Sequence, residues 1–185
     1  MPHLAAMGDK GRITPLAQYV IDVIRLRRLE LGISGKLLSK RISPFGGDSI
    51  VGGIERESTS LKYTTATLKK ALKELGLSMD DILPNKLLSD DTLQDKTKIP
   101  ILKGMSVRAA LNSLLEEGYF NEPRLRREIT EYYNSFFQPE DYKEDNYFSA
   151  QLEDLYNAGK LVKLEPDATN KLIRFQRNPE YDPNA

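Results

Sequence analysis

The chain lacks the residues on which most active sites depend. It contains no cysteine, and His3 is the only histidine among its 185 residues. A disulfide framework, a thiol nucleophile and a cysteine-based zinc site are therefore excluded, and one histidine near the terminus does not predict catalysis or metal binding. The sequence also contains no glycine-rich phosphate loop of recognised form. We therefore expect a protein that is not an enzyme and that binds no metal or cofactor.

Long hydrophobic runs are absent as well. No apolar run approaches the roughly 18 residues of a membrane span. The first residues, MPHLAAMGDKGR, lack the apolar core of a signal peptide. Apolar residues make up 39% and charged residues 29% of the chain, which is typical of a soluble globular protein. We expect a cytoplasmic protein with no membrane partner.

The chain has no excess of either charge, since 27 Lys and Arg balance 27 Asp and Glu. The distribution is uneven, however. Residues 1–76 carry 13 basic and 7 acidic side chains, a net charge of +6, whereas residues 105–185 carry 10 and 15, a net charge of −5. This asymmetry favours different partners for the two parts of the chain, although modest imbalances also arise by chance.

Capping residues and apolar periodicity predict five short helices in the first part of the chain. Each begins at a side chain that can cap it, and the first and fourth end at a glycine. The predicted helices cover residues 15–31, 36–42, 49–57, 65–75 and 78–84. Residues 85–98 are polar and weakly periodic, which predicts a linker.

A second domain is expected over residues 99–177. Apolar stripes predict three helices, and the segments KLVKLE, PDATN and KLIRFQ then predict a strand, a turn and a strand. Residues 178–185 are expected to form a disordered tail.

Four segments of residues 12–84 resemble the lambda-repressor/Cro-like (Xre) helix-turn-helix family in their order and spacing. They are IRLRRLELGIS, LLSKRI, SIVGGIE and LKKALKELGLSMDDILP. The resemblance implies a five-helix bundle whose third helix lies in the major groove of duplex DNA. It also implies that Arg28 of the first helix pairs with Glu55 at the end of the third, as a structural contact whose loss is costly.

The resemblance places base contacts at Asp48, Ser49, Ile50 and Gly53. These residues suit direct readout poorly, because Ile50 offers only a contact with a thymine methyl group and Asp48 repels phosphates. Adjacent glycines favour close approach of the main chain to DNA or to a partner. We therefore expect affinity to come from contacts with phosphates. The candidates for these contacts are Ser34, Lys36, Lys40, Arg41, Lys62, Tyr63, Thr64 and Lys69.

The second domain resembles a winged helix in the order of its elements, a likeness of fold alone. Its third helix, expected from Tyr147 to Ala158, is acidic and follows an acidic loop, which disfavours contact with phosphates. The basic cluster PRLRRE either contacts a DNA backbone or pairs with neighbouring acids. The tyrosines and phenylalanines either fill the core or form an interface. This domain is expected to mediate oligomerisation or partner binding, with a second DNA contact as an alternative.

Together these patterns predict a mainly α protein, with an Xre-like five-helix bundle followed by a winged-helix-like α+β domain. We expect a transcriptional regulator that binds duplex DNA as a homodimer, since paired half-sites multiply weak readout. The alternative is a protein-interaction module, such as an antitoxin or an assembly partner, whose helix-turn-helix has lost its DNA role.

Overall fold

The computed structural model of the protein describes residues 10–43, 49–84, 92–166 and 172–182. The fold is mainly α, as expected, with about 53% of the described residues in helices. Its contacts divide the chain into two compact units. The first unit comprises Met1–Arg28 and Ile33–Lys98, and the second comprises Leu29–Gly32 and Ile99–Ala185.

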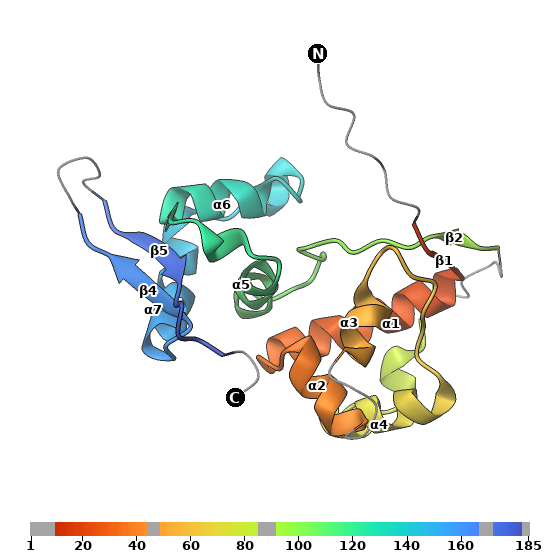
Figure 1. Ribbon diagram of the computed structural model, residues 1–185. Helices are drawn as coiled ribbons and strands as arrows, with labels where there is room; N and C mark the ends of the chain where they lie inside the picture. The colour runs from red at the N-terminus through yellow and green to blue at the C-terminus, as the bar shows by residue number, and fades with distance from the viewer. Residues whose placement is uncertain (1–9, 44–48, 85–91, 167–171, 183–185) are drawn as a thin grey trace, which may run out of the picture. The chain divides into compact units, whose positions relative to one another are not determined.

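The first unit contains the five helical segments that the sequence predicts (Figure 1). They are α1 (Pro15–Glu30), α2 (Gly35–Ile42), α3 (Ile50–Glu55), α4 (Thr65–Leu75) and the 3-10 helix η1 (Asp80–Ile82). The range of the fourth helix is as predicted, those of the first two differ by one residue, and the third and fifth are shorter than predicted.

Side-chain caps explain where these helices begin. The hydroxyl oxygens of Thr14, Ser34 and Thr64 each accept a hydrogen bond from the backbone N–H three residues later. Gly76 ends α4 with a φ of 64°, in the left-handed region that glycine adopts without strain. These predicted caps are confirmed.

Two clusters of buried side chains hold the first unit together. Its larger cluster joins α1, α2, α3 and α4, and the smaller one joins the start of the chain to α1 and α3. The larger contains Ile24, Leu38, Ile42, Val51, Ala71 and Leu75, and the smaller contains Ile13, Ile21 and Ile54. Burial of each large side chain stabilises the fold by about 1.5–3 kcal/mol.

Two distant segments form a strap across the first unit. Strand β1 (Arg12–Ile13) pairs in antiparallel fashion with β2 (Gln94–Asp95). The N–H of Gly11 donates to the carbonyl of Glu57, and a Cβ at residue 11 would collide with the backbone of Thr59. The loop after α3 therefore packs directly against the strap, and only glycine fits at residue 11.

Lys96 follows β2 and is fully buried. Its Nζ donates hydrogen bonds to the carbonyl oxygens of Leu61, at 2.8 Å, and Thr59, at 3.1 Å. Burial lowers the pKa of this ammonium group. The prediction of a linker over residues 85–98 is therefore wrong for residues 92–98, because their hydrogen bonds make them part of the first unit.

The second unit has the predicted order of three helices and a hairpin (Figure 1). The helices are α5 (Val107–Glu116), α6 (Arg126–Asn134) and α7 (Ser149–Asn157). The hairpin strands are β4 (Leu161–Leu164) and β5 (Arg174–Arg177), and β3 (Arg124–Leu125) adds a third strand in the order β3-β5-β4, with antiparallel pairing throughout. Short 3-10 helices lie between them at η2 (Tyr119–Asn121), η3 (Pro139–Asp141) and η4 (Asp145–Phe148).

Two helix boundaries in this unit differ from expectation. Glu122-Pro123 is a typical helix start in sequence, since proline is favoured at the first helical position. Helix α6 nevertheless begins at Arg126, because residues 124–125 are extended and pair with β5. Helix α7 begins at Ser149, because Asp145–Phe148 forms the 3-10 turn η4.

The expected disordered tail is also partly ordered. The backbone N–H of Asn178 donates to the carbonyl of Lys160, at 3.0 Å. Its side-chain amide donates to the carbonyl of Gly159, at 2.7 Å. Within the described range 178–182, the prediction of disorder is therefore wrong.

The aromatic residues of the second unit are divided between the core and the surface. Phe120, Phe148 and Tyr133 are buried, and the rings of Tyr133 and Phe148 pack edge to face with centroids 5.1 Å apart. Tyr142 and Tyr147, in contrast, are each 51% exposed.

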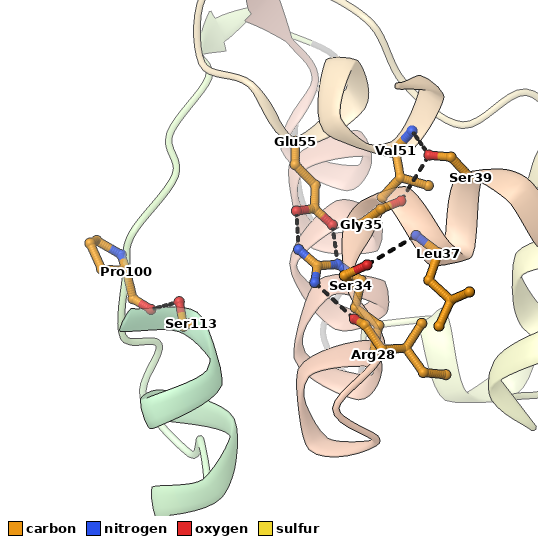
Figure 2. A network of polar contacts seen from close by, with 10 residues as sticks. Arg28, Ser34, Gly35, Leu37, Ser39, Val51, Glu55, Pro100 and Ser113 are labelled. Atoms are coloured by element: carbon orange, nitrogen blue, oxygen red, sulfur yellow. Dashed lines mark hydrogen bonds and ion pairs between the residues drawn. The ribbon is translucent and has the colours of Figure 1, made fainter. Parts of the chain in front are cut away.

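The segment before α5 is tied to that helix. The Ser113 hydroxyl of α5 donates a hydrogen bond to the carbonyl of Pro100 (Figure 2).

Candidate nucleic-acid interface

The predicted pair of Arg28 and Glu55 is present and joins α1 to α3. The Arg28 Nε donates to Glu55 Oε1 at 2.7 Å, and Nη2 donates to Oε2 (Figure 2). The two side chains are only 1% and 4% exposed. A further bond from Arg28 Nη1 to the carbonyl of Ile33, at 3.1 Å, fixes the connection between α1 and α2. This bidentate pair sets where α3 lies relative to the first helix.

Ser39 joins α2 to α3. Its buried hydroxyl donates to the carbonyl of Gly35, at 2.8 Å, and accepts from the backbone N–H of Val51, at 2.9 Å (Figure 2). This second bond satisfies an N–H at the start of α3 that has no partner within the helix. Helices α2 and α3 are thus held together by a buried hydrogen bond as well as by apolar packing.

The adjacent glycines of α3 have different surroundings. A Cβ built on Gly52 would meet nothing within 4 Å, and this residue is exposed. A Cβ on Gly53 would lie 3.3 Å from a methyl group of Leu61. The carbonyl of Gly53 also accepts a 2.6 Å hydrogen bond from the Thr59 hydroxyl. Gly52 therefore exposes the main chain of α3, whereas Gly53 packs against the loop that follows it.

Exposed cations dominate the surface of the segments that include α2, α3 and most of α4. Residues 33–43 and 49–73 contain no exposed carboxylate, since Glu55 is buried and Glu57 is half-buried. The exposed basic residues of these two ranges are Lys36, Lys40, Arg41, Arg56, Lys62, Lys69, Lys70 and Lys73. Such a surface has a positive potential that attracts phosphates.

Most of the predicted contact residues that are described lie at the surface. Lys36, Lys40, Arg41, Ser49, Lys62, Thr64 and Lys69 are exposed. Ser34 and Thr64 both act as helix caps through their hydroxyl oxygens. Asp48 lies outside the described residues.

Tyr63 and Ile50 lie partly in the core instead. Tyr63 packs against both apolar clusters, and its hydroxyl is buried. Burial raises the pKa of this phenol, and the charge of Glu55 raises it further. Ile50 packs against Ile13, Ile21 and Ile54. The Tyr63 hydroxyl is therefore not available to a phosphate in this conformation, which corrects the sequence-based expectation for that residue.

Three cations were not among the candidates from the sequence, namely Arg56, Lys70 and Lys73. Arg56 directly follows α3 and is exposed, at the end of the helix opposite to Ser49. In sequence, the neighbouring Glu55 suggests that the charge of Arg56 is neutralised, but Glu55 is buried and pairs with Arg28 instead. Only the structure shows that Arg56 has no exposed acidic neighbour in residues 49–73.

The described residues contain no group of three or more His, Asp or Glu side chains that could hold a metal ion. Within the same ranges, no helix has both the length and the apolar character that crossing a membrane requires. A scan against protein-family models, a search of curated proteins and a search of solved structures found no significant match to the chain.

Proposed function

We propose that the first unit binds duplex DNA and that the protein is a transcriptional regulator. The observation that carries this proposal is the surface of residues 33–43 and 49–73, where eight exposed cations occur with no exposed carboxylate. Cations on such a surface release counterions when they neutralise phosphates, and this provides affinity for any DNA sequence.

The internal contacts of the first unit support a helix-turn-helix of the lambda-repressor/Cro-like kind. Five helical segments occur in the expected order, and Arg28 and Glu55 form the pair that the resemblance implies. Because Ser39 and Arg28 both anchor α3, its exposed face is held rigidly. A rigid docking element is what selective binding requires.

Selectivity is proposed to come from close approach of the main chain and from DNA shape. Helix α3 is short, and its exposed Gly52 presents backbone rather than a side chain. Backbone groups contact phosphates but do not distinguish bases. The energy of deforming DNA depends on its sequence, so a protein without rich base contacts can still prefer certain sites.

The second unit is proposed to be a winged-helix-like domain that serves protein contacts, including homodimer formation. Its order of elements and the sheet order β3-β5-β4 support the first point. Exposed tyrosines support the second, because aromatic side chains are enriched in protein interfaces. If DNA binding fails, these tyrosines favour the alternative of a protein-interaction module.

The proposal is tested by selection from fragmented source DNA at near-physiological salt, with sequencing of the retained fragments. We expect enrichment of a two-fold-symmetric site. The double variant Lys36→Glu/Arg41→Glu should lose roughly 100-fold in affinity for that site, because two attractive contacts become repulsive.

A matched control carries the same change in charge in the second unit. The variant Arg126→Glu/Arg127→Glu should keep its affinity within a few fold, with both variants folded by circular dichroism. No enrichment by the folded protein would reject the proposal. A comparable loss in both double variants would move the contact with DNA to the second unit or to both units.

A further inference from the structure

A pocket of about 160 Å³ lies between α5 and α7 of the second unit, and it is open at the surface, where Arg108, Asp154 and Ala158 are exposed. Helix α5 provides Arg108, Leu111 and Asn112, which are spaced to share one face. Helix α7 provides Gln151, Asp154 and Leu155, which also share one face, and Ala158 directly follows the helix. Lys160, just beyond α7, completes the wall. A cavity of about this size holds a molecule of roughly benzene size or slightly larger.

Two cations line one side of this cavity. The Nζ of Lys160 donates to the buried Asn112 carboxamide at 3.2 Å, and Asn112 in turn donates to the carbonyl of Leu29. Burial lowers the pKa of Lys160, and the nearby charge of Arg108 lowers it further. An anion placed between these two side chains would relieve their repulsion.

Helix α7 contributes hydrogen-bond acceptors to the same pocket. The Gln151 Oε1 atom is buried, and it has no hydrogen-bond partner among the described residues. The carboxylate of Asp154 lies one turn further along the same face. A buried carboxamide without a partner costs free energy, and a ligand that donates to it removes this cost.

The rest of the lining is aliphatic. Leu111 and Leu155 are both buried core residues, and Ala158 adds a small side chain. The cavity thus offers two cations, acceptors from α7 and an apolar wall within a small volume. Pockets of small ligands combine these features, a mainly apolar lining and a few placed polar groups.

We propose that this cavity binds a small aliphatic α-amino acid. The ligand carboxylate pairs with Arg108 and Lys160, the ammonium group donates to Gln151 Oε1 and Asp154, and the aliphatic side chain packs against Leu111 and Leu155. The site does not depend on the proposed DNA binding, because all of its residues belong to the second unit.

The test is calorimetric titration of the full-length protein with three probes of similar size at neutral pH. L-leucine carries both charged groups, 4-methylpentanoate lacks the amine, and isopentylamine lacks the carboxylate. We expect saturable binding of leucine in the micromolar to millimolar range and at least tenfold weaker binding of the other two, because each lacks one charge-assisted contact.

Variants identify the site. Arg108→Gln and Asp154→Asn should each weaken leucine binding roughly tenfold or more, since each removes one charged contact. Gln151→Leu adds apolar volume to the cavity and should abolish binding while the protein stays folded. The control Glu140→Gln, in the acidic loop, should leave leucine affinity unchanged.

Two results would overturn the proposal. Equal affinity for leucine and 4-methylpentanoate would show that the amine is not recognised. The absence of saturable leucine binding by the folded wild-type protein would show that the cavity takes no ligand of this class.

Discussion

The two units use their charges in opposite ways. In the first unit, the carboxylates of α3 and its following loop are withdrawn from the surface. Glu55 is buried against Arg28, and Glu57 accepts a hydrogen bond from the backbone of Lys98. The cations around them remain exposed. The surface of residues 33–43 and 49–73 is therefore positive, although these two ranges contain two glutamates.

In the second unit, several cations meet a partner close to the surface. Arg127 pairs with Glu131, and Lys163 pairs with Glu153, in both cases at 2.7 Å. Arg124 lies over the ring of Tyr119, at 4.7 Å from its centroid. Two of the three arginines of PRLRRE thus have partners within the second unit. Exposed cations without exposed carboxylates beside them attract phosphates, as on the first unit, whereas cations paired with acids, as on the second, attract them less.

The largest expected effect on stability comes from breaking the buried pair of Arg28 and Glu55, in contrast to the exposed pair of Arg127 and Glu131. Arg28→Ala leaves Glu55 buried without its partner and should lower the free energy of unfolding by about 3–5 kcal/mol. Arg127→Ala removes a pair whose side chains are 77% and 61% exposed, and it should leave the free energy of unfolding almost unchanged, because water screens such a pair. Denaturant unfolding measures both. Equal effects would contradict the contrast between a buried and a solvated pair.

The next effect compares Lys96 with Lys160. Lys96→Met leaves the Thr59 and Leu61 carbonyls without this donor and should cost about 2 kcal/mol. Lys160→Met leaves only the Asn112 carboxamide oxygen without this donor, and should lower the free energy of unfolding by less. Both measurements use denaturant unfolding at neutral pH. A larger loss for Lys160→Met would show that Lys96 does not anchor the strap.

The lowered pKa of Lys96 also predicts the dependence of its contribution on pH. Between its folded pKa and the ordinary value of 10.5, the unfolded chain binds more protons than the folded one. The stability of the wild type should therefore rise relative to Lys96→Met as pH increases towards 10.5. Thermal unfolding of both proteins across this alkaline range measures the difference.

Glycine substitutions give smaller effects of opposite sign. Gly52→Ala in α3 meets nothing within 4 Å and should stabilise the first unit by about 0.5–1 kcal/mol. Gly159→Ala in the second unit must adopt a φ of 68° and should destabilise by about 1 kcal/mol.

If the α3 backbone approaches DNA closely, Gly52→Ala should also weaken binding despite the gain in stability. Unchanged affinity would exclude that approach.

The smallest effect concerns the cap of η1. The N–H and hydroxyl of Ser78 both donate to Asp81, each at 2.7 Å, and these bonds lower the pKa of Asp81. The stabilisation is therefore present above the unfolded pKa of about 4 and lost as pH falls through the lower folded value. Asp81→Asn should flatten this part of the acid unfolding profile. An unchanged profile would mean that the cap contributes nothing measurable.

The sequence predicts those features that depend on neighbours close in the chain. Thr14, Ser34, Thr64 and Gly76 mark helix ends, because a cap is formed within three or four residues. The order of elements in the second unit follows from periodicity for the same reason.

Features that need distant partners were not predictable in this way. Residues 124–125 look like a helix start in sequence, but they pair with β5, about 50 residues later. Tyr63 looks like a surface residue of a polar connection, yet it fills space between two apolar clusters. In the candidate site, Lys36, Lys40, Lys62 and Lys69 were predicted from the sequence, whereas Arg56 needed the burial of Glu55 to be seen.

The strap of β1 and β2 has a consequence for the order of folding. Its two strands are separated by about 80 residues, and the loop between α3 and α4 is anchored through Lys96. During synthesis, the residues of α1–α4 are joined to the chain before residue 96 is added. Pairings between distant segments form slowly, because a long loop must first be closed. Released chains that end before residue 92 are thus expected to have α1–α4 without the strap, and to be cleaved by protease near Thr59 more readily than the full-length protein.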